Sequence, residues 1–317
     1  MTRGVYDYAE GISAVDAFYD GRADQTAAHI LIEQGRAAVI DTATAHAAPR
    51  ILAALAERGV TPAQVDFVVL THVHLDHAGG AGTLMALCPN ARLTVHPRGA
   101  RHMIDPSRLI AATVAIYGAE ATARVYGQVL PVPAERVIET TEGARISLAG
   151  RALEFFDAPG HARHHVVVRD SRSGRLFAGD SFGLSYRALD RDGRASVFPT
   201  TSPSQFDPSA LHATLDRMLA LSPAAVYVAH FGQVGDVPRL GADLHRLLDA
   251  HVALAERCRD AGPTRHARLK AGVAELLREE AARQAWPLAE DALMRLFSID
   301  IELNAQGLGA WLDSAGR

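Results

Sequence analysis

One stretch of the chain, residues 66–80, places three histidines and an aspartate within six positions directly after a β-prone run. The five residues that open the stretch are mostly apolar and predict a buried strand. Alternate side chains on extended backbone point the same way, so His72 and His74 would present both imidazoles to one side. Asp76 and His77 follow past the turn. Zinc and iron prefer imidazole and carboxylate ligands, so this spacing predicts a metal site.

Composition and charge describe an ordinary globular protein and disfavour some partners. Of the 317 residues, 48% are hydrophobic and 21% are charged, which suits one large domain with an appendage or two modest domains. The formal charge of −4 gives no general attraction for nucleic acid or an anionic membrane. We therefore expect a small-molecule substrate as partner, with no nucleic acid and no membrane, and a homo-oligomer is compatible with the sequence.

Cysteine usage and hydropathy lead us to expect a cytoplasmic location. Cys88 and Cys258 lie far apart and match no paired zinc or redox spacing, so both predict small buried hydrophobes in a reducing compartment. The first ten residues lack the apolar region of a secretory signal, and no run of about 18 apolar residues occurs in the sequence.

The order of predicted elements favours an α/β fold with helices outside a sheet. Short β-prone runs fill residues 12–41, a helix is predicted at 49–58, and a further strand at 93–96 follows the histidine cluster. Residues 97–136 interrupt this pattern with helices predicted at 109–116 and 119–129. This insertion is either a lid over the metal site or a helix pair that only packs.

The second half of the chain returns to strands and then becomes helical. A polar loop predicted at 183–208 is a candidate for holding substrate. From residue 236 onward only helical patterns occur, which divides the chain into domains 1–235 and 236–317. The other predicted elements are strands within 137–157, a hairpin of strands 165–168 and 176–178, a helix at 208–221, a last strand at 225–229, and a final helix carrying Leu293, Leu296, Phe297 and Leu303.

Three further candidate ligands each follow a predicted strand. His161 follows the strand at 153–157, Asp180 follows the hairpin, and His230 follows the last strand. Strand ends along one edge of a sheet are where sites are built, because the sheet holds the backbone while the loops vary. We therefore expect these side chains at the same edge as the histidine cluster.

The candidate ligands and their order along the chain resemble those of the metallo-β-lactamase-fold hydrolase superfamily, and the resemblance covers about residues 10–235. The resemblance implies an αββα sandwich with the metals at one edge of two packed sheets, here carrying a helical C-terminal subdomain. The matching residues are Thr71-His-Val-His-Leu-Asp-His77, Pro159-Gly-His161, Gly179-Asp180 and His230.

The resemblance also implies roles for the ligands. His72, His74 and His161 would hold a first metal, Asp76, His77 and His230 a second, and Asp180 would bridge them. Two divalent ions, with zinc expected and iron or manganese as alternatives, would generate a bridging hydroxide at neutral pH.

Supporting residues are expected around these ligands. Asp76 is the candidate proton handler for the leaving group. Asp41 and Thr71 are candidates to orient ligand imidazoles, or they merely cap strand ends. His165 resembles a second histidine of the glyoxalase II pattern and is expected to support the site. His164 stands where that pattern has glycine, and an exposed strand position is expected for it. We assign the eight other histidines to structure or surface.

The reaction expected from this resemblance is hydrolysis of a small ester, thioester or lactone, as in the glyoxalase II and acyl thioesterase-like branches. Two departures disfavour glutathione thioesters as the substrate. The residues after His161 do not follow the glyoxalase II pattern, and Ala43 follows Asp41-Thr42 where the family usually has glycine. A mononuclear iron dioxygenase acting on persulfides, which uses only His72, His161 and Asp180, is the alternative enzyme. A non-catalytic binding protein is disfavoured because every ligand position is filled.

Overall fold

The computed structural model describes residues 3–201 and 205–315, and the chain divides into two compact units. Unit 1 holds both sheets, and unit 2 is mainly helical. Unit 1 comprises Met1–Asp157, His164–Gly179 and Ala224–Gln233, and unit 2 comprises Ala158–Arg163, Asp180–Pro223 and Val234–Arg317.

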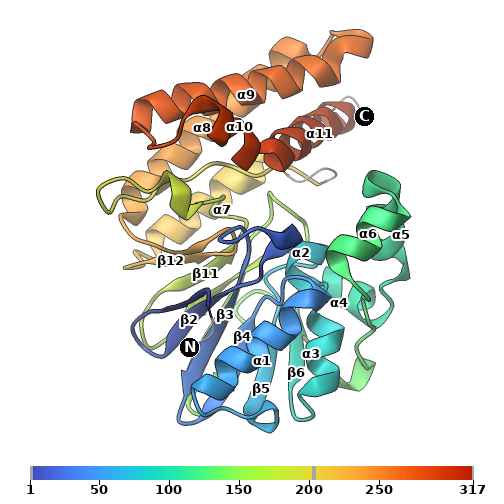
Figure 1. Cartoon of the computed structure of the whole chain (residues 1–317), viewed down its shortest axis with the longest axis vertical. Helices are drawn as coiled ribbons and strands as arrows, with labels where there is room; N and C mark the ends of the chain where they lie inside the picture. Colours follow the sequence, from blue (N-terminus) through green and yellow to red (C-terminus); the bar gives the residue numbers. More distant parts are fainter. Residues whose placement is uncertain (1–2, 202–204, 316–317) are drawn as a thin grey trace. The chain divides into compact units, whose positions relative to one another are not determined.

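The first sheet of unit 1 has seven strands in sequential order, β1 to β7 (Figure 1). Pairing is antiparallel from β1 to β4 and parallel from β4 to β7. The strands are β1 (Val5–Asp7), β2 (Ile12–Asp16), β3 (Ala27–Glu33), β4 (Arg36–Ile40), β5 (Val65–Val69), β6 (Arg92–Val95) and β7 (Val137–Glu139).

The second sheet has six strands in the order β13-β12-β11-β10-β9-β8. Its strands are antiparallel from β8 to β11, whereas β11 and β12 are parallel. The strands are β8 (Arg145–Leu148), β9 (Arg151–Asp157), β10 (Val166–Asp170), β11 (Leu176–Gly179), β12 (Val226–Val228) and β13 (Gly232–Val234), the last residue of which is counted with unit 2.

The side chains of the first sheet alternate between its two faces and contribute to two hydrophobic cores. On β4, Val39 points into one cluster while Ile40 points into the other, because successive side chains leave opposite faces. One cluster lies between the sheets and includes Phe155 and Phe177 of the second sheet. The other lies under helices α1 (Ala48–Glu57), α3 (Ala81–Leu87) and α4 (Pro97–Ile104), which supply Ile51, Leu84 and Met103 (Figure 1). Covered on both faces, the central strands are almost wholly apolar.

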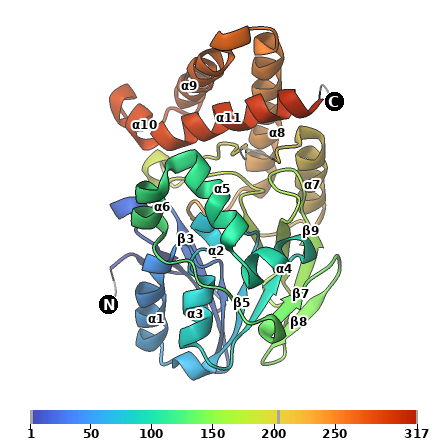
Figure 2. The same cartoon turned by 90° about the vertical axis from the view of Figure 1, so that its right-hand side faces the viewer.

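The insertion at 97–136 contains three α-helices where two helices were predicted. α4 was missed, although Pro97 at its first position and His96, which accepts a hydrogen bond from Arg98 N at 3.0 Å, mark its start. α5 (Ser107–Tyr117) and α6 (Ala119–Tyr126) are neighbouring helices in Figure 2. The prediction that the last helix reaches residue 129 is wrong, because Gly127 has φ +70° and ends it.

Two other expectations about elements are corrected. The strand predicted at 225–229 is not the last, because β13 follows it; with three residues, β13 is too short to show an alternating pattern. The final predicted helix breaks after Leu296 into α10 (Glu290–Leu296) and α11 (Ser298–Ala315). The predicted hairpin is confirmed as β10 and β11.

Unit 2 joins the long loop after β11 to the C-terminal helices. The loop predicted at 183–208 has a short 3-10 helix at Arg187–Leu189 and isolated β-bridges that pair Leu184 with Phe198 and Arg191 with Arg194. Its residues 202–204 lie outside the described residues. Thr201 N donates to Asn304 Oδ1 at 2.8 Å, and Trp286 Nε1 donates to Ser196 Oγ at 2.8 Å. These bonds explain why the loop groups with the helices α7 (Pro208–Ala220), α8 (Val237–Cys258), α9 (Arg265–Gln284), α10 and α11.

The predicted domain boundary at 235 and the lid role of the insertion stay predictions. Asp207 caps the N-terminus of α7, since its carboxylate accepts from Ala210 N at 3.0 Å. Across residues 3–201 and 205–315, no helix combines the length and hydropathy that crossing a bilayer requires.

Candidate metal centre

The histidine cluster begins where β5 ends, at one edge of the first sheet. Because β4 and β5 are parallel, the residues that follow them, Asp41 and Thr71, emerge side by side. Thr71 O accepts a hydrogen bond from Val166 N at 2.8 Å, which brings the start of β10 to the same edge. Gly179, at the end of β11, has φ +48°, and a Cβ there would come within 2.5 Å of Thr71 Oγ1. Glycine therefore allows β11 to end against this edge.

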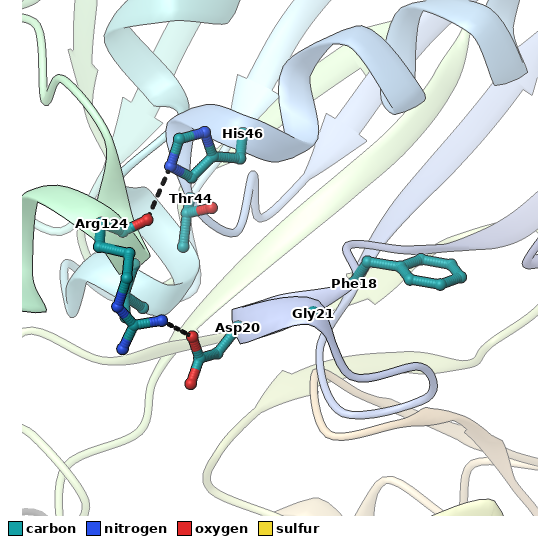
Figure 3. A pocket seen from close by; sticks show the side chains of 7 residues that line it. Phe18, Asp20, Gly21, Thr44, His46 and Arg124 are labelled. Atoms are coloured by element: carbon teal, nitrogen blue, oxygen red, sulfur yellow. Dashed lines mark hydrogen bonds and ion pairs between the residues drawn. The ribbon is translucent and has the colours of Figure 1, made fainter.

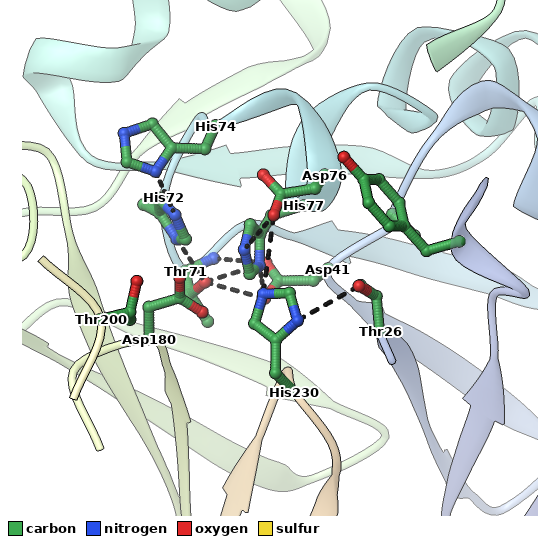
Figure 4. Close-up of polar contacts among 12 residues, drawn as sticks. Thr26, Asp41, Thr71, His72, His74, Asp76, His77, Asp180, Thr200 and His230 are labelled. Carbon is green, nitrogen blue, oxygen red and sulfur yellow. Dashed lines mark hydrogen bonds and ion pairs between the residues drawn. The ribbon is translucent and has the colours of Figure 1, made fainter. Parts of the chain in front are cut away.

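Asp41 organises two of the imidazoles (Figure 4). Its Oδ1 accepts from Thr71 N at 2.8 Å, and its Oδ2 accepts from Thr71 Oγ1 at 2.8 Å. Thr71 Oγ1, having donated its hydrogen, accepts from His72 Nδ1 at 3.1 Å, and His77 Nδ1 lies 3.4 Å from Asp41 Oδ2. Both rings therefore carry the proton on Nδ1, which leaves each Nε2 as the ligand atom.

His72 and His74 direct ring nitrogens at each other. His72 Nε2 lies 2.9 Å from His74 Nδ1, and the rings are nearly perpendicular at 83°. With the proton of His72 on Nδ1, its Nε2 presents a lone pair, so a proton or a metal ion has to lie between the two nitrogens. The contact is satisfied either by a proton on His74 Nδ1 or by a metal ion that both nitrogens bind.

Two further histidines pack on this pair. His165 is buried, and its ring stacks on His72 at 4.8 Å between centroids. The expectation that His164 is exposed is wrong: it is 8% exposed, meets His74 edge-on at 5.6 Å, and accepts from Val73 N at 3.4 Å. The strand β10 begins after His164, so the residue lies in the turn beside the cluster rather than on a strand face.

A second group consists of Asp76, His77 and His230, each of which offers a ligand atom within 4.8 Å of the others. Asp76 Oδ2 lies 3.5 Å from His77 Nε2 and 3.6 Å from His230 Nε2 (Figure 4). His230 Nδ1 donates to the carbonyl of Gln25 at 2.8 Å and lies 3.2 Å from Thr26 Oγ1. Since a carbonyl only accepts, His230 Nε2 is also left as a ligand atom.

Asp76 is ionised in this setting. Burial raises the pKa of its carboxyl, but the positive charges that His77 and His230 carry when protonated, together with their hydrogen bonds, outweigh burial and hold the pKa well below its ordinary value. An ionised carboxylate next to two imidazole nitrogens suits a divalent cation.

In unit 2, His161 and Asp180 lie together. His161 Nε2 is 3.5 Å from Asp180 Oδ2, and both residues are buried. His161 Nδ1 donates to the carbonyl of Thr200 at 3.2 Å, so its Nε2 is again the ligand atom. Asp180 directly follows Gly179, the last residue of β11, and His161 comes four residues after the end of β9. The chain thus attaches both to strand ends of unit 1.

The donor set fits a borderline divalent metal. Seven nitrogen- and oxygen-bearing side chains are buried or half-buried, and four of the five histidines keep Nε2 for a ligand by giving Nδ1–H to an oxygen. Among the other histidines, burial lowers the pKa of His29 to about 3 and that of His251 to about 4, so both are neutral core residues.

The family model described as the metallo-β-lactamase superfamily matches residues 21–230. This chain belongs to that superfamily. The predicted fold is thereby confirmed, with its two sheets and helical C-terminal region. Metal binding, as a general property, follows from this family and from the clustered histidine and aspartate side chains.

Curated relatives within the superfamily match part of the chain. A metallo-β-lactamase fold-containing protein of Sulfurisphaera tokodaii is 29% identical over 181 residues, covering 54% of this chain and 62% of the relative. A hydroxyacylglutathione hydrolase of Aeromonas hydrophila is 29% identical over 169 residues, covering 53% of this chain and 48% of the relative. The matches thus span about half to three-fifths of the length of these relatives.

Solved structures show the same fold over nearly the whole chain. A metallo-β-lactamase family protein of Thermus thermophilus has a TM-score of 0.64 at 22% identity and covers 96% of this chain and 94% of its own. An archaeal superfamily protein from Sulfolobus tokodaii has a TM-score of 0.63 at 22% identity and covers 95% of this chain and 99% of its own.

Several residues that support the ligands were missed by the sequence analysis. The carbonyls of Gln25 and Thr200 each accept a hydrogen bond from a candidate ligand imidazole, and Thr26 contacts His230. Asn304 holds Thr201, the residue after Thr200. Carbonyl partners have no side-chain signature, and these residues lie in loops or far along the chain from the ligands they serve.

Proposed function

We propose that this chain is a metal-dependent hydrolase that cleaves a small ester, thioester or lactone at a binuclear centre. The proposed ligands are His72, His74, Asp76, His77, His161, Asp180 and His230. One observation carries the proposal: His72, His77, His161 and His230 each place Nδ1 against an oxygen and keep Nε2 for a ligand.

The division of ligands follows the family pattern. His72, His74 and His161 are proposed for one metal, and Asp76, His77 and His230 for the other, with Asp180 between them. The local groupings within each unit support this division. Asp41 and Thr71 orient ligand rings, and His165 packs on His72.

The chemistry divides between the metals and the protein. Divalent ions bound by these residues supply Lewis acidity, which polarises a carbonyl and lowers the pKa of water. Asp76, ionised at neutral pH, accepts a proton on its carboxylate and returns it to the leaving group. Zinc is the proposed metal, with iron or manganese as alternatives.

The relatives named hydroxyacylglutathione hydrolase support a thioester or ester as the bond cleaved. The chain departs from their pattern at Ala162 and His164, so glutathione thioesters remain one member of the proposed class. The alternative, a mononuclear iron enzyme acting on persulfides, has no observation in this structure that favours it over hydrolysis among the described residues.

The test combines metal analysis with a substrate panel of acyl-CoA, glutathione thioester, lactone and aryl ester. Two metals per chain with hydrolysis of at least one substrate is the expected result. The matched control is His266→Ala, since His266 is a half-exposed histidine on α9 outside the proposed centre. A single iron per chain with oxygen uptake on a persulfide would overturn the proposal.

A further inference from the structure

A buried side chain of α11, Asn304, holds the loop that follows β11. Asn304 is 1% exposed, and its Oδ1 accepts from Thr201 N at 2.8 Å and from Thr201 Oγ1 at 2.9 Å. Its Nδ2 donates to the carbonyl of Asp300 at 2.9 Å and to that of Pro199 at 3.4 Å. Every donor and acceptor position of the carboxamide is therefore used within unit 2.

The carboxamide of Asn304 skips one residue of the loop, Thr200. It binds the carbonyl of Pro199 before this residue and the N–H of Thr201 after it. A neighbouring parallel strand pairs with a chain in the same way, and the peptide groups of the skipped residue then point to the opposite side. The Thr200 carbonyl accordingly faces away from Asn304, and it accepts a hydrogen bond from His161 Nδ1 at 3.2 Å.

His161 has a second acceptor at its other ring nitrogen. Its Nε2 lies 3.5 Å from Asp180 Oδ2, and both side chains are buried. A neutral imidazole carries one N–H, so the Thr200 carbonyl and the Asp180 carboxylate compete for it. A carboxylate is the stronger acceptor. Unless the carbonyl is held in place, the proton moves to Nε2 and blocks the atom that would bind a metal.

A backbone bridge restrains the loop that carries Asp180 and Thr200. Leu184 and Phe198 pair as an antiparallel bridge, with N–O distances of 2.8 and 2.9 Å. Gly183, which has φ +71°, allows this approach, since a Cβ there would come within 2.5 Å of the Phe198 carbonyl oxygen. The bridge closes the loop between the two competing acceptors, and the hydrogen bonds of the α11 carboxamide continue this restraint beyond it.

We propose that Asn304 is a positioning residue of the metal centre, which fixes the Thr200 carbonyl so that His161 keeps its proton on Nδ1 and offers Nε2 to the metal. The inference rests on the proposed function and gives α11 a role in the metal centre. Asn304 acts through Thr200 and touches no proposed ligand. Its loss should therefore weaken the metal that His161 binds and spare the metal of the Asp76 group.

The first test measures zinc affinity in Asn304→Leu, which keeps a similar volume and removes the carboxamide hydrogen bonds. The dissociation constant of one zinc should rise about tenfold, and that of the other should stay the same. Competition with a chelator measures both constants. Thr201→Val removes only the hydroxyl hydrogen bonds and should raise the same constant less, which keeps the proposal testable if Asn304→Leu does not fold.

The second test needs neither metal nor activity. Imidazole nitrogen NMR on labelled, metal-free protein at about pH 8, where an ordinary imidazole is neutral, reports which ring nitrogen carries the proton. The His161 signals are identified by their loss in His161→Gln. The share of His161 with its proton on Nε2 should be larger in Asn304→Leu and Thr201→Val than in the wild type. A residue that only stabilises the fold would not shift this proton.

The matched control is Ser196→Ala. Ser196 lies in the same loop, is 6% exposed, and accepts a hydrogen bond from Trp286 Nε1 at 2.8 Å. Its loss also loosens the loop from the C-terminal helices, but Ser196 is not next to Thr200. Both zinc constants and the position of the His161 proton should stay as in the wild type.

A second control lies in unit 1, where side chains fasten α6 to the loop after β2 beside a cavity of about 350 Å³ (Figure 3). Asp20 forms an ion pair with Arg124, and His46 Nε2 lies 3.1 Å from the carbonyl of Arg124. Neither contact includes a proposed ligand. Arg124→Met should therefore leave both zinc constants unchanged.

The outcomes separate the two proposals. Unchanged zinc constants and an unchanged His161 proton in Asn304→Leu and Thr201→Val, with two metals bound, would overturn the positioning role and leave the proposed hydrolase intact. Equal changes in Asn304→Leu and Ser196→Ala would also overturn it. A wild-type protein that binds no metal would contradict the proposed function, and the NMR comparison would then decide the positioning role alone.

Discussion

Unit 1 has a buried polar cluster at each end of the same strands, and the two clusters differ in what completes them. At one end Arg151, Asp170 and Glu33 meet, at the start of β9 and the ends of β10 and β3. At the other end lie Asp41 and the histidines that follow β5.

The Arg151 cluster is complete within the chain. Arg151 binds Asp170 through two hydrogen bonds of 2.7 and 2.5 Å and donates to the carbonyl of Glu10 at 2.7 Å. Burial raises the pKa of Asp170, but hydrogen bonds from Arg151 and Ser173 outweigh it and lower the pKa. Donors and acceptors are matched, so this cluster stabilises the fold and has no capacity for a ligand.

In the histidine cluster the two ring nitrogens of a residue have different surroundings. Oxygen atoms occupy the Nδ1 positions of His72, His77 and His230, while their Nε2 atoms converge on acidic or imidazole groups. The contrast teaches that burial alone does not indicate function. The proposed functional cluster directs ring nitrogens toward one another and toward carboxylates, an arrangement that suits a bound cation.

The largest effect is expected from His72→Ala. Removing this ligand should lower kcat/KM on the order of a thousandfold or more and reduce the metal content. Kinetics on the best substrate of the panel, with metal analysis, check this, and His266→Ala is the control. Wild-type turnover and full metal content in His72→Ala would show that the Nε2 atom of His72 is not needed for metal binding or catalysis.

Arg151→Met should break the closed cluster without touching the chemistry. It leaves Asp170 buried without its partner, at a cost of about 3–5 kcal/mol in the free energy of unfolding. Urea denaturation measures the loss. Arg145→Met is the control, because its ion pair with Glu154 is exposed and should contribute about 1 kcal/mol or less. Loss of turnover per folded molecule in Arg151→Met would show that the Arg151 cluster also serves catalysis, and would contradict the functional difference between the two clusters.

Asp41→Asn tests the support behind the ligands. The amide keeps the shape but loses the charge that holds His77 and Thr71, so metal affinity should fall about 10- to 100-fold. Competition with a chelator measures the dissociation constant. Asp66→Asn, which loses an ion pair with Arg36 away from the ligands, should keep wild-type affinity. Equal metal affinity in both variants would show that Asp41 only caps the end of a strand.

The smallest effect concerns pH and the buried His29. Its folded pKa of about 3 lies below the unfolded value near 6.5, so the unfolded state binds the extra proton between these values. Stability should therefore fall as the pH drops from about 6.5, by up to about 1.4 kcal/mol per pH unit from this residue. Urea midpoints against pH should show a flatter slope in His29→Leu. An unchanged slope would contradict the assignment of His29 as a neutral core residue.

Local patterns predicted much of the fold because the signals are short in range. The apolar run before Thr71 and the alternation around Ser173 and Gly174 identify β5 and the β10–β11 hairpin. β13 and α4 were missed because a three-residue strand shows no period and a lone His-Pro start is a weak signal. His164 was misjudged because exposure depends on what packs over a turn.

The sequence by itself determined that the chain belongs to a metal-binding fold, since ligand types and their spacing after strands are local facts. It also predicted that the proposed ligands follow separate strands. Only the tertiary structure decided which nitrogen of each histidine is left for a metal, because the partners are carbonyls and carboxylates from distant loops, such as those of Gln25 and Asp41. It likewise decided that Tyr19 meets Tyr126, a contact across 107 positions that sheet packing makes and no local pattern encodes.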